Sequence, residues 1–254
     1  LKADDQIGAV ILEPTGGHWG AVPIRGEFLK GLREITSRLN RVLIFDEVIT
    51  GFRISPGGAQ AYYGVTPDLT ALAKILAGGL PGGCLAGRAD ILAFIEPRPG
   101  KPKMKHPGTY NANPLSASAG IATLKRIAAG GVCESANASA RTLRNELNRM
   151  FAANGFNWAA YGDFSMVRVV PGATAPADAG DNDGFIPFNN DVSVLDGPKN
   201  TKQVMAMRQG MLLNGVDWWG FAGMTSCEHS VGDMIATVNA MRATLTDMRA
   251  EGLA

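Results

Sequence analysis

The sequence predicts an α/β fold in which a parallel β-sheet is followed by a smaller α+β part. Two apolar, β-rich runs, IGAVIL at residues 7–12 and VLIF at 42–45, have the continuous pattern of strands covered on both faces. Between them, residues 25–40 place apolar side chains at helical spacing. A strand, a helix and a second strand in this order form a βαβ unit, in which the two strands run parallel.

The elements that follow this unit are also predicted from local sequence. DLTALA at residues 68–73 is a short strand, and the proline-rich and lysine-rich residues 96–108 form a loop. A helix over 113–127 begins with Asn113 as its N-cap and Pro114 at its first position, which are favoured residues at those places. These elements extend the parallel-sheet domain by a strand and a helix.

A composition shift at the glycine pair 130–131 indicates a boundary between two domains. We expect a large domain over residues 1–130 and a small α+β domain over 131–254. The elements predicted for the small domain are helices over 133–153, near 200–213 and near 231–250, a strand over 164–170 and a loop over 171–184. Trp218 and Trp219 adjoin in a further predicted strand, so one faces the core and the other an interface.

The composition describes a globular protein without an electrostatic signal for nucleic acid or for an anionic membrane. The chain of 254 residues is 46% hydrophobic, and its 24 basic and 23 acidic residues give a formal net charge of +1. Cys84, Cys133 and Cys227 are scattered without metal-ligand spacing, which predicts no metal site and favours a reducing cytoplasm. No apolar run is long enough to span a bilayer, and no signal peptide is visible.

Lys74 stands between a short apolar run and a glycine-rich bend, in DLTALAKILAGGLPGG at residues 68–83. One interpretation is a surface lysine whose stem lies along apolar neighbours while its amine reaches solvent. The other is a partly desolvated amine, because desolvation lowers the pKa of a lysine and makes it a nucleophile. We expect the second arrangement, since other reactive side chains follow neighbouring strands.

Acidic side chains follow the ends of the other predicted strands, with Glu13 after the first and Asp46 and Glu47 after the second. Ligands of parallel sheets gather at the carboxyl ends of the strands. There a lysine amine can form a Schiff base with an aldehyde, and a carboxylate can hold a ring nitrogen protonated. The GTYNANP turn at residues 108–114 leads into a helix N-terminus, which suits a phosphate. These groups together match the requirements of pyridoxal phosphate.

Each of these residues also has an ordinary structural role open to it. Asp46 can be a cap or an ion-pair partner, Lys74 can be a surface residue and Thr109 can be a turn residue. Glu47 can serve only to brace the end of its strand. The occurrence of all the groups in this order within one α/β unit favours the cofactor site.

Three long segments resemble the signature segments of the class III pyridoxal-phosphate aminotransferases, and within that family the glutamate-1-semialdehyde aminomutase type. The segments are LIFDEVITGFR at 43–53, TPDLTALAKILAGGLPGG at 66–83 and GTYNANPLSASAG at 108–120. EPTGGHWG at 13–20 is similar to the EP loop that precedes them in that family. The resemblance is strong over residues 7–130, and beyond them it is looser and includes SCEHS at 226–230.

The resemblance implies a fold-type I pyridoxal-phosphate-dependent transferase, of which this chain is the C-terminal part of the large domain plus the small C-terminal domain. It implies that Lys74 is the Schiff-base lysine and shuttles a proton, that Asp46 pairs with the pyridine nitrogen and that Val48 packs on one ring face. Thr109, beside Gly108, is implied to reach the phosphate across the subunit interface of a homodimer.

The EP loop carries the expected substrate-side residues, and the sequence departs from the family there and elsewhere. Glu13, His18 and Trp19 are candidates for contact with a substrate, and His18 stands where relatives often carry Asn or Glu. Phe221 stands where an aminomutase would carry an acid near the substrate. The family places a phosphate cup and a ring-stacking aromatic residue well before the EP loop, so this sequence resembles the C-terminal half or so of a full enzyme.

The expected function is transfer of an amino group, through a Schiff base at Lys74, between a small amino compound and a keto acid or aldehyde. One alternative is an aminomutase of the glutamate-1-semialdehyde type. Another is a non-catalytic, truncated fragment that forms only part of the dimer and of the cofactor site. A further alternative, a lysine Schiff-base enzyme without a cofactor, would leave Asp46 and the turn at 108–114 without a partner.

Overall fold

The computed structural model describes residues 1–18, 20–97, 99–100, 102–176 and 184–254, which form two compact units. The first unit comprises Leu1–Thr15 and Ile24–Gly131, and the second comprises Gly16–Pro23 and Val132–Ala254. The boundary between the units at Gly131 and Val132 coincides with the composition shift at residues 130–131. The expected division differs in one respect, because Gly16–Pro23, from the EP loop onward, lies in the second unit.

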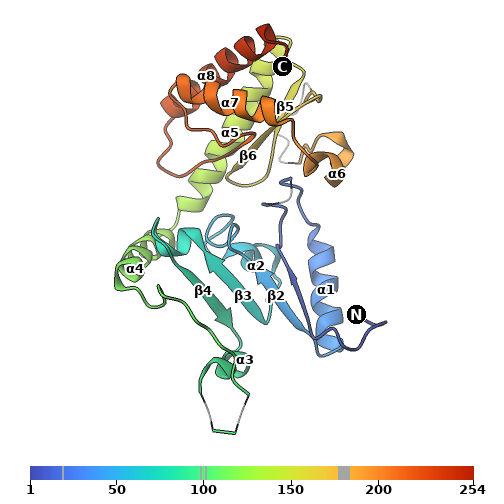
Figure 1. Ribbon diagram of the computed structural model, residues 1–254, viewed down its shortest axis with the longest axis vertical. Coiled ribbons are helices and arrows are strands. Elements are labelled where there is room, and N and C mark those ends of the chain that lie inside the picture. Colours follow the sequence, from blue (N-terminus) through green and yellow to red (C-terminus); the bar gives the residue numbers. More distant parts are fainter. Residues whose placement is uncertain (19, 98, 101, 177–183) are drawn as a thin grey trace. The chain divides into compact units, whose positions relative to one another are not determined.

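The first unit is built on a four-stranded sheet in the order β1 (Ala9–Leu12), β2 (Val42–Asp46), β3 (Leu69–Ala73) and β4 (Gly83–Gly87) (Figure 1). β1, β2 and β3 are parallel, in agreement with the βαβ prediction. β4 runs antiparallel to β3 and forms within the glycine-rich bend, for which no strand is predicted. The sheet of this unit is therefore mixed.

Apolar side chains on one face of this sheet form the core of the first unit. Leu43 and Phe45 of β2 are completely buried and cluster with Leu29 of α1 (Gly26–Arg38) and with Val65. Ile11 of β1 points to the opposite face, where it is 63% exposed. Among the described residues β1 is thus covered on one face, and the prediction of a strand covered on both faces is wrong for it, because α1 packs on one side only.

Short helices and one long helix complete the first unit. They are α2 (Gly58–Tyr63), η1 (Lys74–Ala77), α3 (Ala89–Leu92), η2 (Ala93–Ile95) and α4 (Pro114–Ala128). The predicted start of α4 is confirmed, because the Asn113 side-chain oxygen accepts hydrogen bonds from the N–H groups of Leu115 and Ser116 at 3.0 and 3.2 Å. This cap satisfies two donors that the first turn of a helix leaves unpaired.

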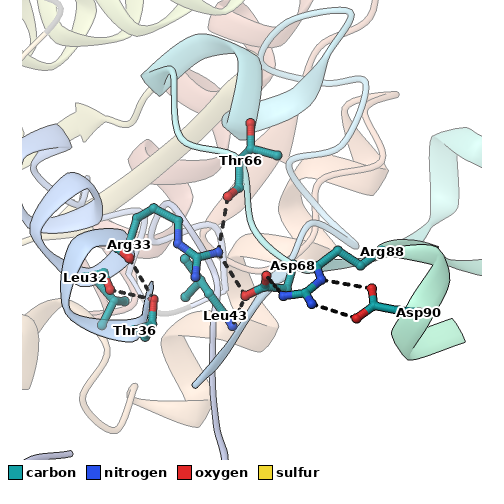
Figure 2. Close-up of polar contacts among 8 residues, drawn as sticks. All are labelled: Leu32, Arg33, Thr36, Leu43, Thr66, Asp68, Arg88 and Asp90. Atoms are coloured by element: carbon teal, nitrogen blue, oxygen red, sulfur yellow. Dashed lines mark hydrogen bonds and ion pairs between the residues drawn. The ribbon is translucent and has the colours of Figure 1, made fainter. Parts of the chain in front are cut away.

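Asp68 joins several elements of the first unit through one buried carboxylate (Figure 2). Its Oδ2 accepts a hydrogen bond from the Leu43 N–H of β2 at 2.8 Å and pairs with Arg33 of α1 at 2.9 Å. Its Oδ1 pairs with Arg88, which lies just before α3, at 3.0 Å. Arg88 also pairs with the exposed Asp90 at 2.7 Å. Asp68 therefore fixes the start of β3 against β2 and α1.

The second unit is built on a three-stranded antiparallel sheet of β5 (Trp158–Tyr161), β6 (Met166–Pro171) and β7 (Ala222–Met224). The long helices α5 (Val132–Ala153), α7 (Thr201–Leu213) and α8 (Val231–Ala250) pack against this sheet around one apolar core (Figure 1). The short helices η4 (Phe188–Asn190) and α6 (Val192–Leu195) lie between β6 and α7 in the chain. The three long helices and the strand over 164–170 are confirmed. The loop expected over 171–184 includes residues 177–183, which lie outside the described residues.

The two tryptophans of the second unit have opposite environments. Trp218 is 4% exposed and belongs to the core, whereas Trp219 is 76% exposed. The expected strand is reduced to a single bridge between Trp219 and Ala222. Phe221 packs edge-to-face on Trp158 with ring centroids 5.4 Å apart, so its side chain contributes to this core. No helix within the described ranges is long and apolar enough to cross a membrane.

Replacement of Asp68 by Asn removes the negative charge that two guanidinium groups face. We expect Asp68→Asn to lower the free energy of unfolding of the first unit by about 2 kcal/mol, less than for a fully buried pair because Arg88 is half exposed. Urea denaturation followed by circular dichroism measures the change. Asp90→Asn, at the exposed end of the same network, is the control and should cost less than about 0.5 kcal/mol. Equal losses in the two variants would contradict the role of Asp68.

The same carboxylate predicts a pH dependence. Burial by itself raises the pKa of Asp68, but the Leu43 hydrogen bond and the guanidinium groups of Arg88 and Arg33 outweigh burial and hold the pKa below 3.8. A carboxylate with a depressed pKa stabilises the folded state fully above its unfolded pKa, and this contribution is lost as the pH falls through the folded pKa. The difference in unfolding free energy between the unchanged chain and Asp68→Asn, measured by urea denaturation, should therefore stay constant above about pH 5 and shrink as the pH falls below about 4.

Candidate functional site

Lys74 is the first residue of η1 and directly follows the last residue of β3. Its backbone has a φ of +51°, in the left-handed region that side-chain-bearing residues rarely adopt, while Ala73 before it is extended. The residue is exposed, so the expected desolvation is absent among the described residues and that prediction is wrong for them. Backbone strain of this kind is concentrated at functional positions, where the surrounding structure enforces it.

Asp46 is the last residue of β2 and pairs in register with Ala71 of β3. It is half-buried, and its Oδ1 accepts a hydrogen bond from the Val48 N–H at 3.1 Å. Its Oδ2 accepts no hydrogen bond from the residues that the structure describes. Because β2 and β3 are parallel, Asp46 and Lys74 leave the sheet at the same edge. Val48, also half-buried, lies in the turn that follows Asp46.

Glu47 has a different environment from its neighbour Asp46, because its side chain is completely buried. One carboxylate oxygen accepts hydrogen bonds from the Thr50 hydroxyl at 3.0 Å and the Ala59 N–H at 2.6 Å. The other accepts from the Gln60 N–H and from the Gln60 side-chain amide, both at 3.2 Å. These bonds join the end of β2 to α2, and the bracing role considered for Glu47 is confirmed.

A cavity of about 460 Å³ lies beside this brace in the first unit. It is lined by Glu47, Gly51, Phe52, Gly57, Gly58, Gln60, Ala61, Thr66 and Leu72. The lining includes neither Asp46 nor Lys74, and the Glu47 carboxylate in its wall is already occupied by the donors of α2. The residues singled out from the sequence for chemistry therefore lie outside this cavity.

Gly108 and Thr109 lie in an exposed turn that leads into α4. The turn is closed by hydrogen bonds from the Asn111 N–H to Gly108 O and from the Asn113 N–H to Tyr110 O, both at 3.1 Å. A Cβ at position 108 would lie against the end of the exposed Asn111 side chain, which would have to shift. Thr109 is presented to solvent close to the N-terminus of α4.

The EP-loop candidates are divided between the two units. Glu13 is half-buried and belongs to the first unit, whereas His18 is exposed and belongs to the second. Trp19 lies outside the described residues. Glu13 directly follows β1, so it leaves the sheet of the first unit at the same edge as Asp46 and Lys74, whereas His18 belongs to the other unit.

The second unit holds its part of the EP loop with two side chains that the sequence did not single out. Arg168 donates hydrogen bonds to Gly17 O and His18 O at 3.3 and 3.4 Å, and the Tyr161 hydroxyl donates to Gly20 O at 2.9 Å. Burial raises the pKa of Tyr161 to about 12, so its hydroxyl remains a donor at neutral pH. Because these partners lie far apart in the chain, local sequence patterns carry no signal for them.

Within the described ranges no group of three His, Cys, Asp or Glu side chains could hold a metal ion. The His229 side chain accepts a hydrogen bond from the Ser226 N–H at 2.9 Å and so orders the loop before α8. The residues whose chemistry suits an organic cofactor are therefore Lys74, Asp46, Val48 and the turn at 108–109.

Known proteins resemble the chain both in sequence and in structure. The model of the family described as "Aminotransferase class-III" matches residues 1–157. A glutamate-1-semialdehyde 2,1-aminomutase of Natranaerobius thermophilus is 46% identical over 154 residues, which are 61% of this chain and 35% of that protein. The enzyme of the same name from Sulfurisphaera tokodaii is 40% identical over 177 residues, 70% of this chain and 42% of that protein. The chain thus spans well under half the length of these curated relatives.

Solved structures extend the similarity over nearly the whole chain. An omega-transaminase from Sphaerobacter thermophilus matches with a TM-score of 0.76 and 29% identity, over 95% of this chain and 52% of that one. A glutamate-1-semialdehyde-aminomutase from Pseudomonas aeruginosa PAO1 matches with a TM-score of 0.77 over 97% of this chain and 53% of that one. At 21% identity, the second match establishes a shared fold alone. The fold is that of transaminases and aminomutases, as expected.

The left-handed backbone at Lys74 predicts an unusual order of stability among substitutions. Glycine adopts positive φ without strain, so we expect Lys74→Gly to exceed Lys74→Ala in unfolding free energy by about 0.5 to 1 kcal/mol. Lys125, exposed on α4, is the matched control, and there glycine should be less stable than alanine by about 1 kcal/mol. Urea denaturation of the four variants tests this, and the same order at both positions would contradict the strain at Lys74.

Proposed function

Because the chain belongs to the class III aminotransferase family, we propose that it supplies the Schiff-base lysine and the ring-pairing acid of a pyridoxal-phosphate-dependent aminotransferase. The observation that carries the proposal is the common sheet edge of Asp46 and Lys74, set by the parallel pairing of β2 with β3. One group is an acid and the other an amine, and these are the two groups that a pyridoxal ring and its aldehyde require.

The residues present fit pyridoxal phosphate in their chemistry. The Asp46 Oδ2, without a hydrogen-bond donor in the described part of the chain, is available to the proton of a ring nitrogen. Val48, in the turn that follows Asp46, offers an apolar side chain. The Lys74 amine is exposed for reaction with an aldehyde. Bound pyridoxal phosphate supplies an electron sink for the bonds to the substrate's amino carbon.

Each of these side chains has a defined task in the proposed reaction. Lys74 would hold the cofactor through its aldehyde carbon and, when its amine is free, would carry a proton to and from the substrate's amino carbon. Asp46 would pair with the ring nitrogen and favour its protonated form, which strengthens the electron sink. The Thr109 hydroxyl, close to the N-terminus of α4, would bind the phosphate of a cofactor in the neighbouring subunit. An amino compound is the donor, and a keto acid or aldehyde is the acceptor.

We propose further that Thr109 serves the partner's cofactor in a homodimer, as the family resemblance implies. The exposed apolar surface around this turn supports an interface there. Tyr110 is 68% exposed, and Leu115 and Ile121 on α4 are 70% and 55% exposed. Large exposed apolar side chains on and beside α4 favour a protein contact in this region.

The substrate side and the cellular location belong to the same proposal. Glu13 and His18, with Trp19, are proposed to flank the substrate. A cytoplasmic location is supported by three cysteines, none of which forms a disulfide. Small molecules are the proposed substrates, and the balanced charge of the chain gives no support to a nucleic acid partner.

Two other functions have specific support. The curated relatives that the chain matches at 46% and 40% identity are aminomutases, which favours the aminomutase alternative. Against it, Phe221 has an apolar side chain packed on Trp158 where an aminomutase would carry an acid. The truncated, non-catalytic alternative is supported by the exposure of Lys74 and by the 63% exposure of Ile11 on the sheet.

Reductive trapping tests the proposed role of Lys74. The amine condenses with the aldehyde of pyridoxal phosphate, releases water, and forms a C=N bond that borohydride reduces to a stable secondary amine. We expect one dominant modified peptide, at Lys74, in the unchanged chain. It should persist in Lys125→Ala and disappear in Lys74→Ala, together with any transamination that the unchanged chain shows.

The pattern of labelling also separates the alternatives. Labels scattered evenly over exposed lysines would contradict the proposal for this polypeptide and would support the non-catalytic alternative. A dominant adduct at Lys74, followed by amino transfer from an amino donor to a separate acceptor, supports the aminotransferase. Amino migration within glutamate-1-semialdehyde, without a separate acceptor, would favour the aminomutase instead.

A further inference from the structure

The short helix that begins at Lys74 depends on neighbouring elements for its position. η1 has four residues and is a single 3₁₀ turn, which contributes little stability of its own. Lys74 begins this turn in the left-handed conformation, and Gly78 ends it in the same conformation. The direction of the Lys74 side chain therefore depends on whatever fixes residues 75–81.

The backbone of α4 lies directly against the backbone of residues 76–78, with no side chain between them at two glycines. A Cβ built on Gly120 of α4 would lie 2.5 Å from Leu76 O, closer than real Cβ atoms approach. A Cβ built on Gly78 would lie 2.5 Å from Ala119 O and 2.7 Å from the Thr123 hydroxyl. Glycine at both positions is what allows η1 to lie directly against the helix.

Ser116 adds a directed bond to this contact. It lies four residues before Gly120, on the same face of α4, and its hydroxyl donates to Pro81 O at 2.7 Å. The contact at Leu76 and the bond at Pro81 hold the segment after Lys74 at two points. The Asn113 cap fixes the start of the helix that makes both contacts.

We propose that Ser116 and Gly120 are positioning residues that hold Lys74 in its reactive orientation. This inference rests on the function proposed above. Neither residue is assigned contact with a cofactor or a substrate. They act by preventing η1 from moving along or away from α4, because a displacement of about 1 Å at a reacting group can cost two orders of magnitude in rate.

Competitive trapping within one molecule tests the inference. The chain is treated with pyridoxal 5'-phosphate and borohydride, and the label at Lys74 is divided by the label at Lys125, which is exposed on α4. We expect Ser116→Ala and Gly120→Ala to lower this ratio about tenfold, because the amine loses its fixed orientation. Ser116→Thr keeps the hydroxyl and should restore most of the ratio.

Matched controls separate positioning from loss of stability. Ser118→Ala removes a hydroxyl on the same helix that bonds only to Pro114 O, at 2.8 Å. Gly31→Ala places a methyl group on a helical glycine of α1 that has nothing within 4 Å. Both controls should leave the labelling ratio unchanged. The free energy of unfolding of each variant is measured in urea, so that labelling is compared where all variants are folded.

Each outcome decides the inference. A tenfold lower ratio in Ser116→Ala, with an unchanged ratio in Ser118→Ala, supports positioning. An unchanged ratio in both Ser116→Ala and Gly120→Ala, whatever their stability, overturns the inference and leaves the proposed role of Lys74 intact. If the unchanged chain itself shows no preference for Lys74 over Lys125, both the inference and the proposed function fail for this polypeptide.

Discussion

The parallel pairing of β2 with β3 brings Asp46 and Lys74, the acid and the amine of the proposed site, to one edge of the sheet, and buried acidic residues brace this pairing at both ends. At the start of β3, Asp68 accepts the Leu43 N–H of β2 and pairs with guanidinium groups from α1 and from the chain before α3. At the end of β2, the Glu47 N–H donates to Ala71 O at 2.9 Å while its carboxylate is bonded to α2. Because each oxygen of the two carboxylates accepts at least one hydrogen bond, these contacts support the register that puts Asp46 beside Ala71.

Asp46 and Glu47 show how environment assigns different tasks to neighbouring acids. Successive residues at a strand end point to opposite sides, and here one carboxylate is completely buried among donors while the other keeps an oxygen without a donor among the described residues. The first is structural, and the second is available for a ligand. Lys74 is held in a complementary way, since its position comes from a strand before it and from α4 behind the turn that it begins. Chemistry at this edge thus depends on residues that do not take part in it.

Local sequence patterns predicted the elements of the fold well, and long-range contacts explain what they missed. The apolar runs gave the three parallel strands, and Asn113-Pro114 gave the start of α4. Asp68 was not singled out, because its partners Arg33 and Arg88 lie 35 and 20 residues away. The prediction that Lys74 is partly desolvated is wrong for the described residues, because glycines beside a lysine do not show which other segments cover it. Burial on both faces was inferred from β-rich runs, but such a run cannot show whether a second layer is present.

The protonation of the cofactor ring tests the central claim most directly, namely that Asp46 and Lys74 act on one group at one edge of the sheet. Pyridoxal phosphate labelled with ¹⁵N in the ring is bound to the unchanged chain and to Asp46→Asn, and the ring-nitrogen chemical shift is measured by NMR. We expect a protonated nitrogen in the unchanged chain and a deprotonated nitrogen in Asp46→Asn, with Lys74 still the site of attachment in both. The same chemical shift in the two proteins, with the ligand attached at Lys74, would contradict it.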